Sequence, residues 1–190
     1  MGDLKKYLEN KKNSNPDGEI FTNAQIESIL AQLTLALCHS HQRKIYHRDV
    51  KLSNIFVMSD QNGQIRVKLG DFGAGRQVDH TDMNVGTNVG TQGYTAPEVY
   101  DFGKYTSKAD SWSLGIVLYT LCDNGEPLLF GRPNQIKQAI DAEAYLNRIE
   151  TLEDRPEQLK VYLRQLLRKK HQGGNTEVVR PTLTEFLADA

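Results

Sequence analysis

The sequence has few of the features that mark secreted, membrane-bound or disulfide-stabilised proteins. Its 190 residues include two cysteines, Cys38 and Cys122, and each lies inside an apolar helical pattern. We expect both to be small buried side chains in a reducing compartment, with a disulfide or a reactive thiol as the alternative. The sequence also has no apolar run long enough to span a membrane and no segment with the pattern of a secretory signal. These absences predict a cytosolic or nuclear protein that has no membrane partner.

An excess of charge of one sign is also lacking. Lys and Arg number 23, and Asp and Glu number 24, which gives a formal net charge of −1. Nucleic acids and anionic membrane surfaces attract proteins that carry a clear excess of Lys and Arg. The composition therefore predicts that neither is a partner, and we expect the basic run at 168–170 to be a solvated helix end.

What the sequence does have is helical periodicity over most of its length. A chain of this length can form one domain with a sizeable core but not two ordinary domains. Thr22 and Gln25 have the form of a capping box, and apolar residues at spacings of three and four follow them as far as Gln42. We therefore expect one mostly α unit with a small β-hairpin. The expected helices cover residues 1–12, 23–42, 108–121, 134–149, 159–167 and 182–187, and the expected strands cover 55–58 and 65–69.

The residues with the clearest chemical meaning are His47-Arg48-Asp49-Val50-Lys51-Leu52-Ser53-Asn54. They match the H-R-D-L-x-x-x-N pattern of the protein-kinase catalytic loop, with Val50 in place of leucine. Four more kinase motifs follow in order, and five in sequence are very hard to obtain by chance. The chain thus resembles the C-terminal (large) lobe of a eukaryotic protein kinase over residues 1–190, with a catalytic loop at 47–54 and an activation segment at 71–98. The later motifs are Asp71-Phe72-Gly73, Gly90 to Glu98, Asp110 to Gly115, and Arg180.

The resemblance implies a role for each polar residue of these motifs. Asp49 is expected to orient the hydroxyl group of a protein substrate, and Lys51 to neutralise the phosphate during transfer. Asn54 and Asp71 are expected to hold Mg²⁺, a cation that prefers oxygen ligands. Thr91 is expected to shape the acceptor site, and together with Lys51 it favours a Ser/Thr kinase over a tyrosine kinase.

Within the kinases, the segments Asn54-Ile55-Phe56 and Lys68 to Gly73 are similar to those of the NIMA-related (Nek) kinases. Phe56 is then expected to form the floor of the adenine pocket, in addition to its place in a strand. Asp3 matches an acidic position that can reach the ribose of ATP, with helix capping as the alternative. This resemblance adds association with the cytoskeleton to the expected cytoplasmic or nuclear location.

The same resemblance implies regulation and structural support around the catalytic loop. Arg48 and Arg76 are expected to pair with a phosphate on Thr87, which would make an upstream activating kinase a partner. His47 is expected to pack rather than to act as a base, and Asp110 to hold the backbone of the catalytic loop. A partly buried ion pair is expected between two further motif residues, Glu98 and Arg180.

The other half of a kinase cannot be placed on this sequence. The Gly-rich phosphate loop, the strand lysine and the helix glutamate that pairs with it have no counterpart here. We therefore expect an N-terminal lobe to be absent. The predicted function is transfer of the γ-phosphate of ATP to protein Ser or Thr hydroxyls, with ATP and Mg²⁺ as cofactors, by a truncated or partial kinase domain. The alternative is a catalytically silent, one-lobed interaction module.

Overall fold

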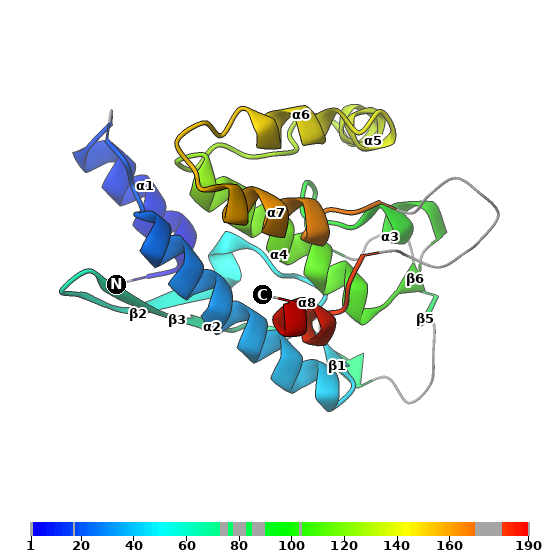
Figure 1. Ribbon diagram of the computed structural model, residues 1–190. Helices are drawn as coiled ribbons and strands as arrows, with labels where there is room; N and C mark the ends of the chain where they lie inside the picture. The colour runs from blue at the N-terminus through cyan, green and yellow to red at the C-terminus, as the bar shows by residue number, and fades with distance from the viewer. Residues whose placement is uncertain are drawn as a thin grey trace.

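The computed structural model describes residues 2–16, 18–72, 76–77, 83–84, 90–102, 104–169 and 180–189. These residues form a mostly helical unit with small antiparallel two-stranded sheets, so the expected fold class is confirmed. Figure 1 shows the two longest helices, α2 (Asn23–Gln42) and α4 (Ser107–Cys122), side by side, with the hairpin of β2 (Ile55–Gln61) and β3 (Gln64–Leu69) beside the N-terminus. Within the described residues, no helix is both long and apolar enough to cross a membrane.

The first two helices, α1 (Leu4–Ser14) and α2 (Asn23–Gln42), begin at caps that the sequence supplies. The side chain of Asp3 accepts a hydrogen bond from the backbone N–H of Lys6, and Thr22 and Gln25 form the predicted capping box. The apolar residues of α2 that were expected at spacings of three and four are buried. The helix ends at Gln42, as predicted.

The predicted hairpin consists of β2 (Ile55–Gln61) and β3 (Gln64–Leu69), and both strands extend closer to the turn than the sequence suggested. The two turn residues, Asn62 and Gly63, have φ angles of 53° and 76°. This left-handed pair matches the right-handed twist of a hairpin. One face of the hairpin packs on α2, while Phe56 and Met58 point to the opposite, exposed face.

Both edges of the hairpin are hydrogen-bonded to other parts of the chain. The side-chain amide of Gln32, on α2, donates to the Ile65 carbonyl and accepts from the Val67 N–H, both at 2.9 Å. At the other edge, the Val57 N–H donates to the Gly2 carbonyl at 3.0 Å. The hairpin is therefore fixed to α2 and to the start of the chain.

Helix α4 (Ser107–Cys122) is the centre of the core and contacts α2, α7 (Glu157–Leu166) and α8 (Leu183–Asp189) (Figure 1). All but its first two residues are buried, including Trp112. At Gly115 an added Cβ would lie 2.8 Å from the Leu167 side chain, so the absence of a side chain lets the residue after α7 approach α4. Cys38 and Cys122 are free and buried, as expected.

The expected helix at 134–149 is two helices, α5 (Pro133–Asp141) and α6 (Ala144–Glu150). The break occurs at Glu143, which has a φ of 53°, a left-handed conformation that ends α5 and turns the chain. The apolar spacing is shifted by only one position at this break, since the buried residues Ile136, Ile140, Tyr145 and Ile149 are four, five and four residues apart. Periodicity alone therefore predicted one helix where there are two.

Several short elements around the activation segment were not predicted. Strand β1 (Ile45–Tyr46) pairs with β4 (Arg76–Gln77), and β5 (Met83–Asn84) pairs with β6 (Lys104–Tyr105). Helix α3 (Pro97–Phe102) follows the last motif of the segment. Two-residue pairings carry no periodicity that a sequence can reveal, yet they fix where parts of the 71–98 segment lie.

Candidate active site

Four predicted site residues meet at the end of the catalytic loop. The Asp49 carboxylate accepts hydrogen bonds from the Thr91 hydroxyl at 2.6 Å and from the Asn54 amide at 3.1 Å, and it pairs with Lys51 at 2.6 Å. Lys51 also donates to the Thr91 hydroxyl at 2.8 Å. Asn54 sits at the end of the short 3₁₀-helix η1 (Leu52–Asn54), whose tight turn brings its amide back to the Asp49 carbonyl at 2.8 Å. The catalytic loop and the activation segment thus meet at one carboxylate.

The surroundings of Asp49 favour its charged form. Burial opposes ionisation, but hydrogen bonds from Lys51, Thr91 and Asn54 and the charge of Lys51 outweigh it and hold the pKa of Asp49 below its ordinary value. A lowered pKa means that the ionised group stabilises the fold above the ordinary Asp pKa of about 3.9. That stabilisation is lost as the pH falls through the lower pKa of the folded state. Asp49 is therefore a carboxylate at neutral pH.

We expect the substitution Lys51→Met to raise the pKa of Asp49 above that of the parent protein, because burial then opposes ionisation without the nearby ammonium group. A carbon-13 NMR titration of the Asp49 carboxyl would measure this shift. Lys11→Met is the matched control, since Lys11 pairs with Asp60 at 3.3 Å on the hairpin instead. An Asp49 pKa that is the same in the parent protein and in Lys51→Met would contradict the conclusion that Lys51 lowers the pKa of Asp49.

Asp110 holds the backbone of the catalytic loop from inside α4, as predicted. It is fully buried, and its carboxylate accepts the N–H groups of His47 at 2.9 Å and Arg48 at 3.0 Å. Its other partners are the His41 ring nitrogen at 2.8 Å and the Tyr105 hydroxyl at 2.7 Å. Burial raises the pKa of Asp110, but these bonds and the nearby His41 ring lower it overall. The carboxylate therefore fixes the loop as a charged, fully bonded group.

His47 links the catalytic loop to the residues before Asp71. Its Nε2 donates to the Gly70 carbonyl at 2.8 Å, and its Nδ1 accepts the Asp49 N–H at 3.3 Å. Its ring also packs against the Phe72 ring, with centroids 4.5 Å apart. Because both ring nitrogens are bonded to backbone, His47 has the expected packing role.

Asn54 and Asp71, the predicted metal ligands, are connected through the backbone. The Gly70 N–H donates to the Asn54 carbonyl at 2.9 Å, which places the end of β3 beside η1. The Asn54 amide nitrogen already donates twice to Asp49, so the oxygen of that amide is the atom suited to a cation. An amide oxygen and the exposed Asp71 carboxylate are the hard ligands that Mg²⁺ takes, and they fit the ion. No cluster of three His, Cys, Asp or Glu side chains that could hold a metal occurs within the described residues.

Two residues of the catalytic site have left-handed backbone conformations. Arg48 has a φ of 70° and Asp71 a φ of 57°. Such conformations are costly for residues other than glycine and persist where the surroundings fix them. At Arg48, the bond from its N–H to Asp110 provides that restraint. Arg48 directly precedes Asp49, which is expected to bind substrate, and Asp71 is itself expected to bind metal.

The two predicted nucleotide residues lie side by side. Asp3 and Phe56 form an isolated antiparallel bridge, and Phe56 is 42% exposed on the outer face of the hairpin. An added Cβ on Gly70 would lie 2.8 Å from the Phe56 ring, so the absence of a side chain at Gly70 lets the ring approach the backbone. The Asp3 carboxylate caps α1, which is the alternative that the sequence left open. Its role toward ribose stays a prediction.

The predicted regulatory residues are only partly described. Arg48 is buried, and its guanidinium lies 5.7 Å from the centroid of the Tyr105 ring. The backbone of Arg76 pairs with that of Tyr46 in the β1–β4 sheet, and Tyr46 lies two residues before Arg48 in the sequence. Thr87 and Gly73 lie outside the described residues. Pairing of both arginines with a phosphate stays a prediction.

The expected ion pair between Glu98 and Arg180 is present and buried. The Arg180 guanidinium meets the Glu98 carboxylate at 2.8 and 3.3 Å and also donates to the carbonyls of Lys108 and Arg168. It lies 4.9 Å from the Trp112 ring centroid. The pair therefore joins α3, at the end of the activation segment, to the core.

Sequence reasoning did not find two partners of the site, His41 and Tyr105. Both bond to Asp110, from the end of α2 and from β6. His41 lies in the last turn of α2 and Tyr105 lies in the two-residue strand β6, and neither position belongs to a motif. The signal that could have found them is the buried charge of Asp110, which requires hydrogen-bond donors.

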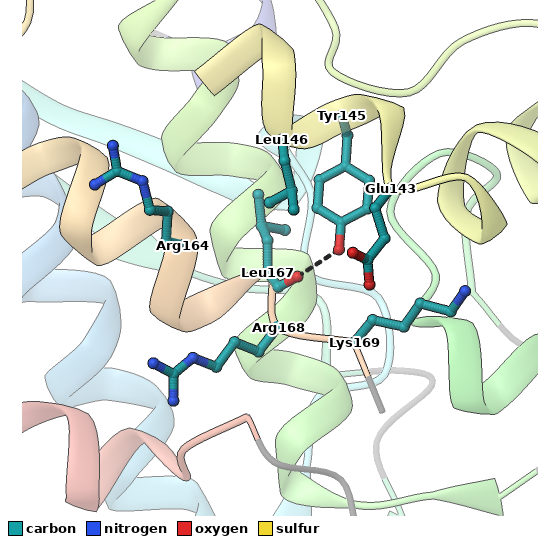
Figure 2. Close-up of a pocket in the computed structure, with 7 residues that line it drawn as sticks. All are labelled: Glu143, Tyr145, Leu146, Arg164, Leu167, Arg168 and Lys169. Carbon is teal, nitrogen blue, oxygen red and sulfur yellow. Dashed lines mark hydrogen bonds between the residues drawn. The ribbon is translucent and has the colours of Figure 1, made fainter. Parts of the chain in front are cut away.

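A pocket of about 470 Å³ lies apart from these residues, between α6 and the end of α7 (Figure 2). The Tyr145 hydroxyl donates to the Leu167 carbonyl at 2.9 Å across its wall. Burial raises the pKa of Tyr145 to about 12, with a contribution from the charge of Glu143. None of the predicted catalytic, nucleotide or metal residues lines this pocket. It is lined by Glu143, Tyr145, Leu146, Arg164, Leu167, Arg168 and Lys169.

Comparison with known proteins agrees with this arrangement. The family model described as "Protein kinase domain" matches residues 1–189. Serine/threonine-protein kinase Nek5 of Homo sapiens is 40% identical over 139 residues, which cover 73% of this chain and 18% of that protein. Serine/threonine-protein kinase Nek1 of Mus musculus is 42% identical over 121 residues, or 64% of this chain and 9% of that protein. Nek3 of Mus musculus is 38% identical over 121 residues, or 64% and 22%.

The chain thus spans about a tenth to about a fifth of the length of these relatives. The match to the family model nevertheless covers nearly every residue, including the catalytic loop and the activation segment. The chain therefore belongs to the protein kinase family and resembles the Nek serine/threonine kinases.

Proposed function

We propose that this polypeptide is a serine/threonine protein kinase, which transfers the γ-phosphate of ATP to Ser or Thr hydroxyl groups of proteins. The observation that carries the proposal is the hydrogen-bond system that joins Asp49, Lys51 and Thr91. Phosphoryl transfer needs a group that positions the acceptor hydroxyl and cations that balance the phosphate charge, and Asp49 and Lys51 can fill these two roles.

Each of these side chains has a distinct task in the proposed reaction. Asp49 accepts the hydrogen bond of the substrate hydroxyl, in the place where it now accepts that of Thr91, and so aims the oxygen at the phosphorus. Lys51 balances negative charge on the phosphoryl oxygens as they pass between donor and acceptor. Magnesium-bound ATP, held by Asn54 and Asp71 with Asp3 and Phe56 at the nucleoside, supplies the phosphoryl group and further charge neutralisation.

The first experiment is to incubate the complete polypeptide with ATP, Mg²⁺ and a peptide library. Mass spectrometry should detect phosphoserine or phosphothreonine, and EDTA should abolish the signal because the phosphate charge is then uncompensated. Peptides whose only hydroxyl is that of tyrosine are the control and should stay unmodified. Failure to modify any Ser or Thr peptide, with Mg²⁺ present and ATP binding detected, would contradict the proposal.

A catalytically silent interaction module is the second candidate. The observation that favours it is the outer face of the hairpin, where Phe56 and Met58 are 42% and 52% exposed. Exposed apolar side chains grouped on one face are typical of a surface that binds another molecule. Absence of both ATP binding and phosphate transfer would favour this candidate over the kinase.

Regulation by an upstream kinase forms a further part of the proposal. Arg48 and Arg76 are the cations that would pair with a phosphate on Thr87 and order the activation segment. We propose that this polypeptide lies in the cytoplasm, with a nuclear or cytoskeleton-associated location as the alternative, and that the upstream kinase acts on it there. Replacing Thr87 with Ala should then remove the activating effect of phosphorylation but not the basal transfer.

A further inference from the structure

The segment 127–131, between α4 and α5, has its first two carbonyls hydrogen-bonded by a side chain of α6, and its residues Leu128 and Leu129 are buried in the core. The Arg148 guanidinium donates to the carbonyl of Pro127 at 2.8 Å and to that of Leu128 at 2.9 Å. It also lies 5.5 Å from the centroid of the exposed Phe130 ring. A charged, planar group with several fixed donors can hold an irregular backbone in one conformation.

The same guanidinium is itself anchored at the end of α4. It lies 5.3 Å from the Tyr119 ring centroid and 3.4 Å from the Asp123 carboxylate. That carboxylate also accepts the Tyr119 hydroxyl at 2.6 Å, a bond that, with burial, raises the pKa of Tyr119. Arg148 is therefore fixed at both ends, to the core helix and to the 127–131 segment.

The far side of the 127–131 segment touches the acceptor side of the active site. The Gln92 amide donates to the Gly131 carbonyl at 2.6 Å. Gly93 has a φ of 86°, and a Cβ there would lie 2.9 Å from the Leu129 carbonyl oxygen, so the two backbones are in direct contact. These two residues directly follow Thr91, whose hydroxyl bonds Asp49.

Besides its bonds to Asp49 and Lys51, Thr91 is held by the Thr95 hydroxyl, which donates to the Thr91 carbonyl at 3.1 Å. The Tyr94 hydroxyl is hydrogen-bonded to the backbone of Leu52, and the Tyr94 carbonyl accepts from Ser113 at 2.8 Å. Thr91 lies three residues before Tyr94, and its neighbours Gln92 and Gly93 contact the 127–131 segment. A shift of that segment would therefore move the Thr91 side chain relative to Asp49.

We propose that Arg148 is a positioning residue for the acceptor site, acting through the 127–131 segment on Gln92, Gly93 and Thr91. Arg148 acts through these intervening residues and does not itself touch the reacting atoms. Its effect is to fix the position at which a substrate peptide binds. The kinetic part of this inference rests on the proposed kinase function, whereas the structural part does not.

The test compares Arg148→Met with Arg164→Met in the complete polypeptide. The two arginine side chains are 34% and 35% exposed and both form ion pairs, but Arg164 pairs with Glu150 and Glu157, away from the acceptor site. Amide hydrogen exchange is the first readout, because it needs no activity. The reporter is the Tyr94 N–H, which donates to the Thr91 carbonyl at 3.0 Å, and the internal control is the Asn54 N–H, which donates to the Lys51 carbonyl at 3.0 Å.

We expect Arg148→Met to speed exchange at Tyr94 about tenfold while exchange at Asn54 stays unchanged. In the peptide assay it should raise the KM for peptide about tenfold and leave the KM for ATP unaltered, a smaller effect than the roughly 100-fold that a displacement of about 1 Å can cause. Gln92→Met should have a similar effect, and the double variant should be no worse than either single variant, because both act on the same link.

Equal exchange at Tyr94 in Arg148→Met and Arg164→Met would overturn the inference. So would a fully additive double variant, or faster exchange at Tyr94 and Asn54 alike, which would indicate general destabilisation. If the parent protein transfers no phosphate to any peptide, the proposed function fails, and the exchange comparison still decides the positioning role of Arg148.

Discussion

Arg180→Met is expected to lower the free energy of unfolding by about 3–5 kcal/mol, the usual cost of removing one partner of a buried ion pair. Arg180 is fully buried, and its loss would leave the Glu98 carboxylate, itself 8% exposed, without its cation. The carbonyls of Lys108 and Arg168 would lose their donor as well. Urea denaturation followed by circular dichroism would measure the change.

Two further variants distinguish the loss of the buried Arg180–Glu98 ion pair from the general effect of replacing an arginine. Arg180→Met combined with Glu98→Met should recover part of the lost stability, because an apolar pair leaves no buried charge. Arg164→Met removes an exposed ion pair and should cost no more than about 1 kcal/mol. If Arg180→Met unfolds at the same urea concentration as Arg164→Met, the ion pair does not hold α3 to the core.

Asp49→Asn is expected to reduce the turnover of phosphate transfer by about 10²–10⁴-fold, the range typical of a positioned acid–base group. Asparagine keeps the size of the side chain, so it can still accept the Thr91 hydroxyl, but it has no charge to orient and polarise a substrate hydroxyl. Because the Asp49 carboxylate of the parent protein is ionised at neutral pH, the reduction in turnover should already be seen at pH 7. Single-turnover kinetics with a Ser/Thr peptide would measure it.

The control for this variant is Asp60→Asn. Asp60 also forms short hydrogen-bonded contacts, with Tyr7 and Lys11, but at the hairpin and away from the catalytic loop. Its replacement should leave turnover within a factor of about two, as expected of a site that does not touch the reacting groups. The kinase proposal does not survive if Asp49→Asn turns over as fast as Asp60→Asn.

Motif spacing could predict which residues gather at the candidate site because their contacts are local. Asp49, Lys51 and Asn54 lie within six residues, and η1 folds them onto one another. The contact of Thr91 with Asp49 spans 42 positions, and it could be anticipated only from the family resemblance. The main helices and the hairpin were also predictable, since their apolar periods match the faces that are buried.

The rest depended on tertiary contacts that no short pattern records. The break at Glu143 is a single left-handed residue that shifts the apolar spacing by only one position, so two helices were predicted as one. The donors to Asp110 come from elements far apart in the sequence, and the link from Arg148 to Gln92 passes through backbone carbonyls that any residue type could supply. Contacts to backbone leave little trace in residue identity.

The bonds along both edges of the hairpin bear on the solubility of the protein. An open strand edge presents unpaired N–H and C=O groups to which a strand of another molecule can add. Here the Gln32 side chain occupies that position at Ile65 and Val67, and residues Gly2 and Asp3 occupy it along β2. The Gln32 side chain thus takes the place of a neighbouring strand at these positions, and this part of the hairpin is closed to intermolecular sheet growth even where its outer face is apolar.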